Sequence, residues 1–185
     1  MSCLPSREYK RILVLSIPWW IKVITTITGI IVAVFVLRQG LSVQELLFTL
    51  LVMILIMIIN RYLHEKCHAW TFQILTGNPT EIRLNSLSQP FCRMLTPCPV
   101  RPYIIGTLAP LAVVTALGFG CSLSYLTKSH VSITTGLAIT TILTLSGMAA
   151  DILWAWRLRN VPPESVVIDH GISAEVYIHK PKEYS

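Results

Sequence analysis

Residues 43–68 read VQELLFTLLVMILIMIINRYLHEKCH, an apolar run that ends in the pattern H-E-x-x-H. Since a transmembrane helix needs roughly 20 apolar residues, the run up to residue 63 is long enough to cross a bilayer. His64 and His68 are four residues apart, so on a helix both imidazoles lie on one face and can reach one zinc ion. Glu65 projects beside that face, where it can take a proton from a zinc-bound water. The stretch therefore predicts a membrane helix that ends in a zinc site.

The composition of the whole chain supports a membrane protein. Of the 185 residues, 53% are hydrophobic and only 13% are charged, whereas a soluble domain has about 25% charged residues. The net charge is +6, but the basic residues lie next to apolar runs and form no stripe with interleaved aromatic residues. This distribution is typical of topology signals and argues against a nucleic-acid partner. The five cysteines are an odd number and are expected to be reduced thiols.

Four segments are long and apolar enough to span the hydrocarbon core. They predict an all-α membrane protein with four transmembrane helices, in which residues 1–160 form the membrane domain and residues 161–185 form a cytoplasmic tail. The predicted spans cover about residues 17–37, 43–63, 103–126 and 131–156.

Basic residues orient these spans. They precede the first span, accompany the long connection between the second and third spans, and follow the fourth span. The positive-inside rule therefore places both termini and the long middle connection in the cytoplasm. The residues that carry this signal are Arg7, Lys10, Arg11, Arg61, Lys66, Arg83, Arg93, Arg101, Arg157 and Arg159.

The segments outside the spans contain further helix and some strand. The helical apolar spacing continues through residues 64–75 and stops at Gly77, which is followed by Asn78-Pro79. Residues 81–84 alternate like a half-buried strand, so a hairpin or a re-entrant loop is expected in the middle connection. In the tail, residues 165–168 and 174–178 have the pattern of two short strands.

A catalytic zinc normally takes three protein ligands and keeps a position for water. Asp151 is the best third ligand, because it is the acidic residue within the third and fourth spans and a carboxylate in hydrocarbon needs a strong partner. The predicted topology also puts it at the level of the two histidines. Asp169 and His170 are alternative ligands, since the tail could fold back under the membrane. As a further alternative, Asp151 could pair with Arg157 or Arg61 at the interface.

Asn60 lies one turn before His64 on the same helical face. It could orient a ligand or the substrate, and it could equally be an ordinary polar residue at the membrane interface.

The chain resembles a family of small bacterial membrane proteins called Putative zincin peptidase. The resemblance is carried by H-E-x-x-H on the second span, Arg101-Pro102-Tyr103 before Leu108-Ala109-Pro110, Ser146-Gly147 before Asp151-Ile152, and residues 167–170 of the tail. It is also similar, more distantly, to the site-2 protease group of intramembrane metallopeptidases, where an aspartate in a leucine-aspartate-glycine motif is the third ligand. Here Asp151 is flanked by Ala150 and Ile152 instead. The resemblance implies a location in the bacterial plasma membrane.

The residues together predict a membrane-embedded zinc metalloprotease that hydrolyses a peptide or a membrane-protein substrate near the cytoplasmic boundary. His64, His68 and Asp151 would bind Zn²⁺, and Glu65 would act as the general base. A non-catalytic membrane protein with a structural or regulatory zinc is the alternative. A metal transporter is disfavoured, because the central parts of the spans are almost free of ionisable residues. The substrate, the pathway and the oligomeric state stay open.

Overall fold

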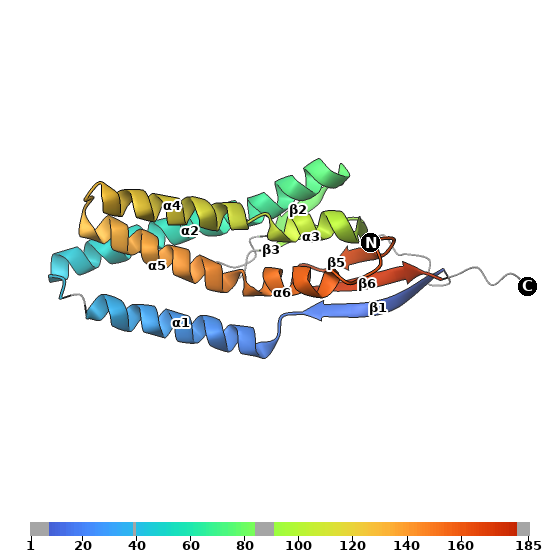
Figure 1. The fold of residues 1–185 in the computed structure, drawn as a ribbon, viewed down its shortest axis with the longest axis horizontal. Helices are drawn as coiled ribbons and strands as arrows, with labels where there is room; N and C mark the ends of the chain where they lie inside the picture. Colours follow the sequence, from blue (N-terminus) through green and yellow to red (C-terminus); the bar gives the residue numbers. More distant parts are fainter. Residues whose placement is uncertain (1–7, 39, 84–90, 181–185) are drawn as a thin grey trace, which may run out of the picture. The chain divides into compact units, whose positions relative to one another are not determined.

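The computed structural model describes residues 8–38, 40–83 and 91–180 (Figure 1). Helices dominate, and short antiparallel strands lie before, between and after them. In chain order the elements are β1 (Tyr9–Ser16), α1 (Trp19–Leu37), α2 (Val43–Thr76), β2 (Thr80–Arg83), β3 (Phe91–Met94), β4 (Cys98–Pro99), α3 (Val100–Leu108), α4 (Leu111–Leu126), α5 (Val131–Gly147), α6 (Ala149–Leu158), β5 (Val166–Asp169) and β6 (Ser173–His179).

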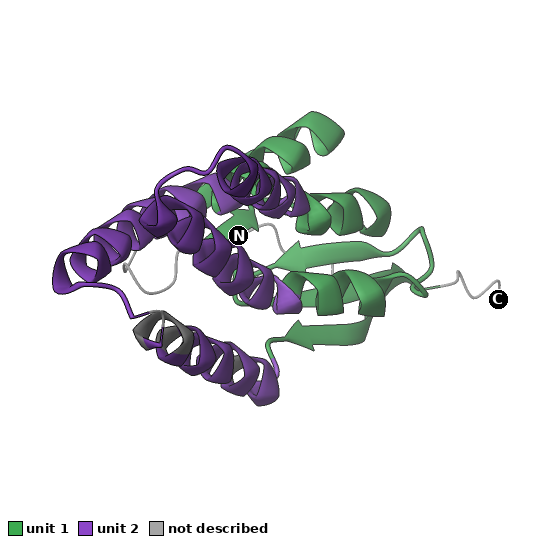
Figure 2. Cartoon of the chain, turned by 60° about the vertical axis from the view of Figure 1, so that its left-hand side comes forward, with its two compact units in different colours: residues 1–17, 65–109, 151–185 green, residues 18–64, 110–150 purple. Residues whose placement is uncertain are grey.

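The chain divides into two compact units (Figure 2). Unit 1, green in Figure 2, comprises residues 1–17, 65–109 and 151–185, and unit 2, purple, comprises residues 18–64 and 110–150. The boundary between residues 64 and 65 falls inside the continuous helix α2. The expected division into residues 1–160 and 161–185 stays a prediction.

Unit 2 is a set of apolar helices. Val32 of α1 and Ile139 of α5 are buried in one small core cluster, with Met53 of α2 packed beside them. Gly136 lets α5 approach α2 closely, since a Cβ atom there would lie 3.0 Å from Cγ1 of Val52. Small residues that allow such close approach are typical of helix packing in membranes.

Within the described residues, three helical segments are long and apolar enough to cross a membrane: Val43–Thr76, Val100–Leu126 and Val131–Leu158. In the most apolar 18-residue window of the first, only 11% of the residues are buried. Most large apolar side chains of this window are therefore exposed on the surface of the helix. Such exposure is typical of a helix that faces lipid, whereas a soluble protein would bury these side chains in its core. Three of the four predicted spans are thus matched by helices that could span a membrane.

The first predicted span, residues 17–37, is different. Helix α1 (Trp19–Leu37) occupies most of it, but it is not among the three helices that, within the described residues, are long and apolar enough to cross a membrane. A fourth transmembrane helix therefore stays a prediction.

Unit 1 is built around a four-stranded antiparallel sheet in the order β1-β6-β5-β4. The predicted tail strands are confirmed as β5 and β6, which pair through a turn at Gly171. The predicted strand in the middle connection is confirmed as β2, which forms a two-stranded hairpin with β3. Leu84, at the end of the predicted alternation, lies outside the described residues.

The sequence predicted no strand before the first span, and this was wrong: Tyr9–Ser16 form strand β1. Its residues pair with β6 from Tyr9 opposite His179 to Ser16 opposite Ser173. Arg11 donates to Glu175 Oε1 across this pair at 2.7 Å. The basic residues at its start have the pattern of a topology signal, and the partner strand is more than 150 residues away, so nothing in the local sequence indicates the pairing.

The core of unit 1 joins the sheet to the helices. It combines residues of β1, β5 and β6 with the last turns of α2 and with α3 and α6. Its buried members are Leu15, Ala69, Phe72, Cys92, Met94, Cys98, Val100, Tyr103, Trp154, Leu158, Val167, Ala174 and Val176.

Asp169 at the end of β5 connects several segments of this core. Its Oδ1 accepts the Gly171 N–H at 2.7 Å and its Oδ2 accepts the Met94 N–H at 3.4 Å. Burial raises the pKa of Asp169 to about 6, although these bonds, nearby His170 and a hydrogen bond with Tyr103 act in the opposite direction. A buried carboxyl of this kind is easier to hold in its neutral form.

Replacing Gly106 by alanine is expected to destabilise the fold. The new Cβ would overlap the ring of Phe72, which is 3% exposed and cannot move aside easily. Overpacking of this kind typically costs about 1–3 kcal/mol. Thermal unfolding in detergent measures the effect, with Gly120→Ala as the control, because a Cβ at Gly120 meets nothing within 4 Å. Equal melting temperatures for the two variants would contradict the close packing of α3 on α2.

Asp169 should make stability depend on pH. Its pKa of about 6 in the folded protein exceeds the ordinary value of 3.8, so the folded state binds this proton more tightly than the unfolded chain. This stabilisation is complete below about pH 4 and is lost as the pH rises through about 6, with a size of about 3 kcal/mol. Denaturant unfolding between about pH 4 and pH 7 should show this fall in wild type and in Glu164→Gln, which alters an exposed carboxyl. An unchanged slope in Asp169→Asn would refute it.

Candidate metal centre

Helix α2 presents the two histidines of H-E-x-x-H. The helix continues without interruption from Val43 to Thr76 and ends where Gly77 adopts a φ of +69° and donates to the Gln73 carbonyl at 2.8 Å. The helical extension past the apolar run, and its stop at Gly77, are therefore confirmed. With regular helix on both sides, residues at positions i and i+4 share one face.

Asp151 comes from the helix after a break. Helix α5 ends at Gly147, Met148 is fully buried, and α6 begins at Ala149. Asp151 thus lies in the first turn of α6. A carboxylate at this position interacts favourably with the positive end of the helix dipole.

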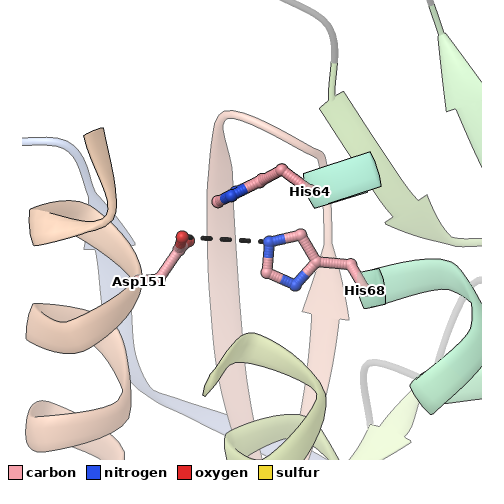
Figure 3. A group of neighbouring side chains, drawn as sticks. All are labelled: His64, His68 and Asp151. Atoms are coloured by element: carbon pink, nitrogen blue, oxygen red, sulfur yellow. Dashed lines mark ion pairs between the residues drawn. The ribbon is translucent and has the colours of Figure 1, made fainter. Parts of the chain in front are cut away.

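The structure brings His64, His68 and Asp151 together (Figure 3). One imidazole nitrogen from each histidine and one carboxylate oxygen all lie within 4.8 Å of one another. His68 Nε2 and Asp151 Oδ2 are 3.8 Å apart. In Figure 3 the three side chains point toward a common centre from α2 and α6.

The three donors fit a divalent metal. Two imidazole nitrogens and one carboxylate oxygen are a typical protein ligand set for zinc, with a fourth position left for water. With bonds of about 2.0–2.1 Å, the ligand atoms of a tetrahedral zinc lie about 3.3 Å apart. Here the three candidate atoms lie within 4.8 Å of one another, with 3.8 Å between His68 Nε2 and Asp151 Oδ2, so a bound zinc would draw the side chains closer together.

His68 is held in the orientation that a metal ligand needs. Its Nδ1 lies 2.8 Å from the carbonyl oxygen of Gly106, so Nδ1 donates the proton and Nε2 is left with its lone pair facing Asp151. Its ring also stacks on Phe72, with centroids 6.2 Å apart, and Phe72 in turn stacks on Tyr103 at 5.4 Å. A backbone acceptor behind a metal-binding histidine fixes its tautomer and raises its basicity.

Glu65 is buried beside these ligands on α2. Its carboxylate is near enough to Cys92 that, after burial, its negative charge contributes to raising the pKa of that thiol to about 12. Cys92 is therefore a neutral thiol, and Glu65 is the carboxylate that follows the first candidate ligand in the sequence.

The alternative ligands of the tail lie elsewhere. The close group of possible ligand atoms among the described residues does not include Asp169 or His170. Asp169 is occupied by Gly171 and Met94 as described above, and His170 lies 3.9 Å from Glu175. Of the third ligands considered, Asp151 is the one that the structure places beside the histidines.

Asn60 is buried one turn before His64, and its Nδ2 donates to Thr144 Oγ1 on α5 at 2.6 Å. Two groups that contact the candidate site residues His68 and Asn60 were not predicted. Gly106 acts through its backbone carbonyl, which has no side-chain signal. Thr144 has only a weak signal: it precedes Asp151 by seven residues, which would share a face of an unbroken helix, but α5 ends at Gly147 and Asp151 lies on α6.

Comparison with known proteins yields a family but no individual relative. None of the curated proteins and none of the solved structures matches this chain. One family model does match, over residues 54–166, which is more than half of the chain and includes all three residues of the candidate metal centre. By this match the chain belongs to the family described as Putative zincin peptidase.

Proposed function

We propose that the protein is a membrane-embedded zinc metalloprotease that hydrolyses peptide bonds near the cytoplasmic boundary of the bilayer. The observation that supports this most is the convergence of His64, His68 and Asp151 in a member of a zincin peptidase family. A buried carboxylate, Glu65, stands next to the first ligand in the sequence. A site with only a structural role has no evident need for that carboxylate.

In the proposed topology, four helices span the membrane and both termini are cytoplasmic. Three of these helices are the candidate spans, and α1 would be the fourth. The positive-inside rule supports this orientation, and the family resemblance supports a bacterial plasma membrane. The lipid bilayer and a peptide or membrane-protein substrate are the proposed partners.

The chemistry follows from the residue types. His64, His68 and Asp151 would hold the zinc, which when bound polarises the scissile carbonyl and makes a water ligand more acidic. Glu65 would accept a proton from the attacking water as its oxygen bonds to the carbonyl carbon. The same carboxyl would then deliver that proton to the amine nitrogen as the C–N bond breaks. Water is consumed, and a carboxylate and an amine are formed.

The substrate would have to be extended at the cleaved bond. In a helix each carbonyl is hydrogen-bonded within the segment, and its carbon is shielded by the surrounding turns. Local unwinding exposes the bond, and the strands of the middle connection offer backbone groups that could pair with an unwound segment. Strand β2 of this two-stranded hairpin is the proposed element, since it pairs with β3 on one side, whereas the Met94 N–H of β3 is already bonded to Asp169.

Zinc content tests the ligand set. Mass spectrometry of detergent-purified protein should find about one zinc per chain in wild type. His64→Ala and Asp151→Ala should lose most of it, whereas His179→Ala, a change of an exposed histidine, should keep it. Folded wild type that takes up no zinc even after reconstitution would rule out the proposed function.

Glu65→Gln separates catalysis from a structural zinc. The amide cannot act as a base, so peptide hydrolysis should fall by about 10²–10⁴-fold while zinc content stays at the wild-type level. The readout is the set of new protein N-termini in membranes of cells that express wild type, compared with cells that express Glu65→Gln. This comparison works whichever protein is the substrate. Identical sets of N-termini, with zinc present in both proteins, would favour the non-catalytic alternative.

A further inference from the structure

Asn60 is an unusual residue in its surroundings. It lies in the apolar run of α2, where polar side chains are expensive unless they have partners. Only 7% of the residue is exposed. Its Nδ2 donates to Thr144 Oγ1 at 2.6 Å, so part of its hydrogen-bonding capacity is used by a contact within unit 2.

The orientation of the Asn60 amide is defined by Thr144. The Thr144 hydroxyl donates its proton to the Thr140 carbonyl at 2.7 Å. Its oxygen can therefore only accept from Asn60, which makes the group facing Thr144 the NH₂ end of the amide. Oδ1 is then directed away from this contact.

Oδ1 of Asn60 is buried and accepts no hydrogen bond from the described residues. Nearly all buried polar atoms in proteins have a partner, so each exception needs a reason. An amide oxygen that is buried, fixed in direction and unoccupied is suited to receive a donor that reaches it in the working protein.

His64, one turn further along α2, is the candidate ligand that follows Asn60 in the sequence. Residues four apart are neighbours on a helix surface, and side chains lean toward the N-terminal end of the helix. This general geometry favours a position of the His64 ring toward the turn that carries Asn60. Asn60, His64 and Thr144 all belong to unit 2.

A histidine that binds a metal through one ring nitrogen usually donates the N–H of the other to a carboxylate or a carbonyl oxygen. At His68 this acceptor is the carbonyl of Gly106, at 2.8 Å. The amide oxygen of Asn60 is chemically the same kind of acceptor, and it lies on the same helical face as both histidines.

We propose that Asn60 is a positioning residue of the metal centre: its Oδ1 accepts the ring N–H of His64 when that imidazole binds the metal, and Thr144 fixes the amide for this contact. The proposal rests on the zinc site of the proposed function. Each histidine would then have its own hydrogen-bond acceptor: the backbone carbonyl of Gly106 for His68, and the side-chain carbonyl of Asn60 for His64.

The test compares zinc affinity in variants of the full chain in detergent. Asn60→Leu has a similar volume but no acceptor, Asn60→Asp keeps an acceptor oxygen, and Thr144→Val removes the group that fixes the amide. Thr140→Val is the matched control, because the Thr140 side chain is also buried and bonds to the Gly136 carbonyl of its own helix. Competition with a chromophoric chelator gives the dissociation constant for Zn²⁺, and thermal unfolding of the metal-free protein monitors the fold.

The expected result is a zinc affinity that falls about 10- to 100-fold in Asn60→Leu. It should fall in the same direction, but less, in Thr144→Val and in Asn60→Asp, which keeps the acceptor oxygen but loses the Nδ2 contact to Thr144, and it should stay within a few-fold of wild type in Thr140→Val. The absorption spectrum of the Co²⁺-substituted protein should change in Asn60→Leu and not in Thr140→Val. If Asn60→Leu does not fold, Thr144→Val decides the question.

Wild-type zinc affinity in both Asn60→Leu and Thr144→Val would overturn the proposal and leave the zinc site itself intact. A lower melting temperature of the metal-free variants with unchanged affinity would also overturn it, since Asn60 would then serve only helix packing. A wild-type protein that binds no zinc would instead overturn the proposed function, and the role of Asn60 with it.

Discussion

The hydrogen bond between His68 Nδ1 and the Gly106 carbonyl is the contact on which the candidate centre depends. It requires α3 to lie against the last turns of α2, and this approach is possible only because Gly106 has no side chain in the space that Phe72 fills. Phe72 in turn stacks between His68 and Tyr103. The orientation of one imidazole is thus determined by the tight packing in unit 1, and a ligand held in this way loses little freedom when it binds a metal.

Two of the polar residues at or near the candidate centre have neighbours on another helix. Asp151 lies near His68, and Asn60 bonds to Thr144. In an apolar setting an unpaired polar group is expensive, so such pairs specify which helix faces which. The same residues then contribute to the candidate metal site and to the packing of the helices. A substitution at Asp151 or Asn60 should be read for both effects, which is why metal affinity and the stability of the metal-free protein have to be measured separately.

Three of the four predicted spans are matched by helices, because long apolar runs are a local signal. The grouping of Asp151 with His64 and His68 could also be predicted, because the topology places Asp151 at their level. The H-E-x-x-H spacing, the stop at Gly77 and the isolated carboxylate at Asp151 are visible in the sequence before any tertiary contact is considered. Strand β1 was missed because its partner is distant in the chain and its basic residues have a second, equally good interpretation. The acceptor at Gly106 could not be predicted, since a backbone carbonyl carries no residue-specific signal.

The pairing of β1 with β6 has a consequence for biosynthesis. Leu15 from the first strand and Val176 from the last are buried in the same core as Phe72, which stacks on His68. Ribosomes make proteins from the N-terminus at about 5–20 residues per second, so the chain emerges with both histidines in place several seconds before its final strand. Until that strand pairs, the core behind His68 is incomplete. A nascent chain therefore carries the candidate ligands without their rigid support until β6 has been made and has paired with β1.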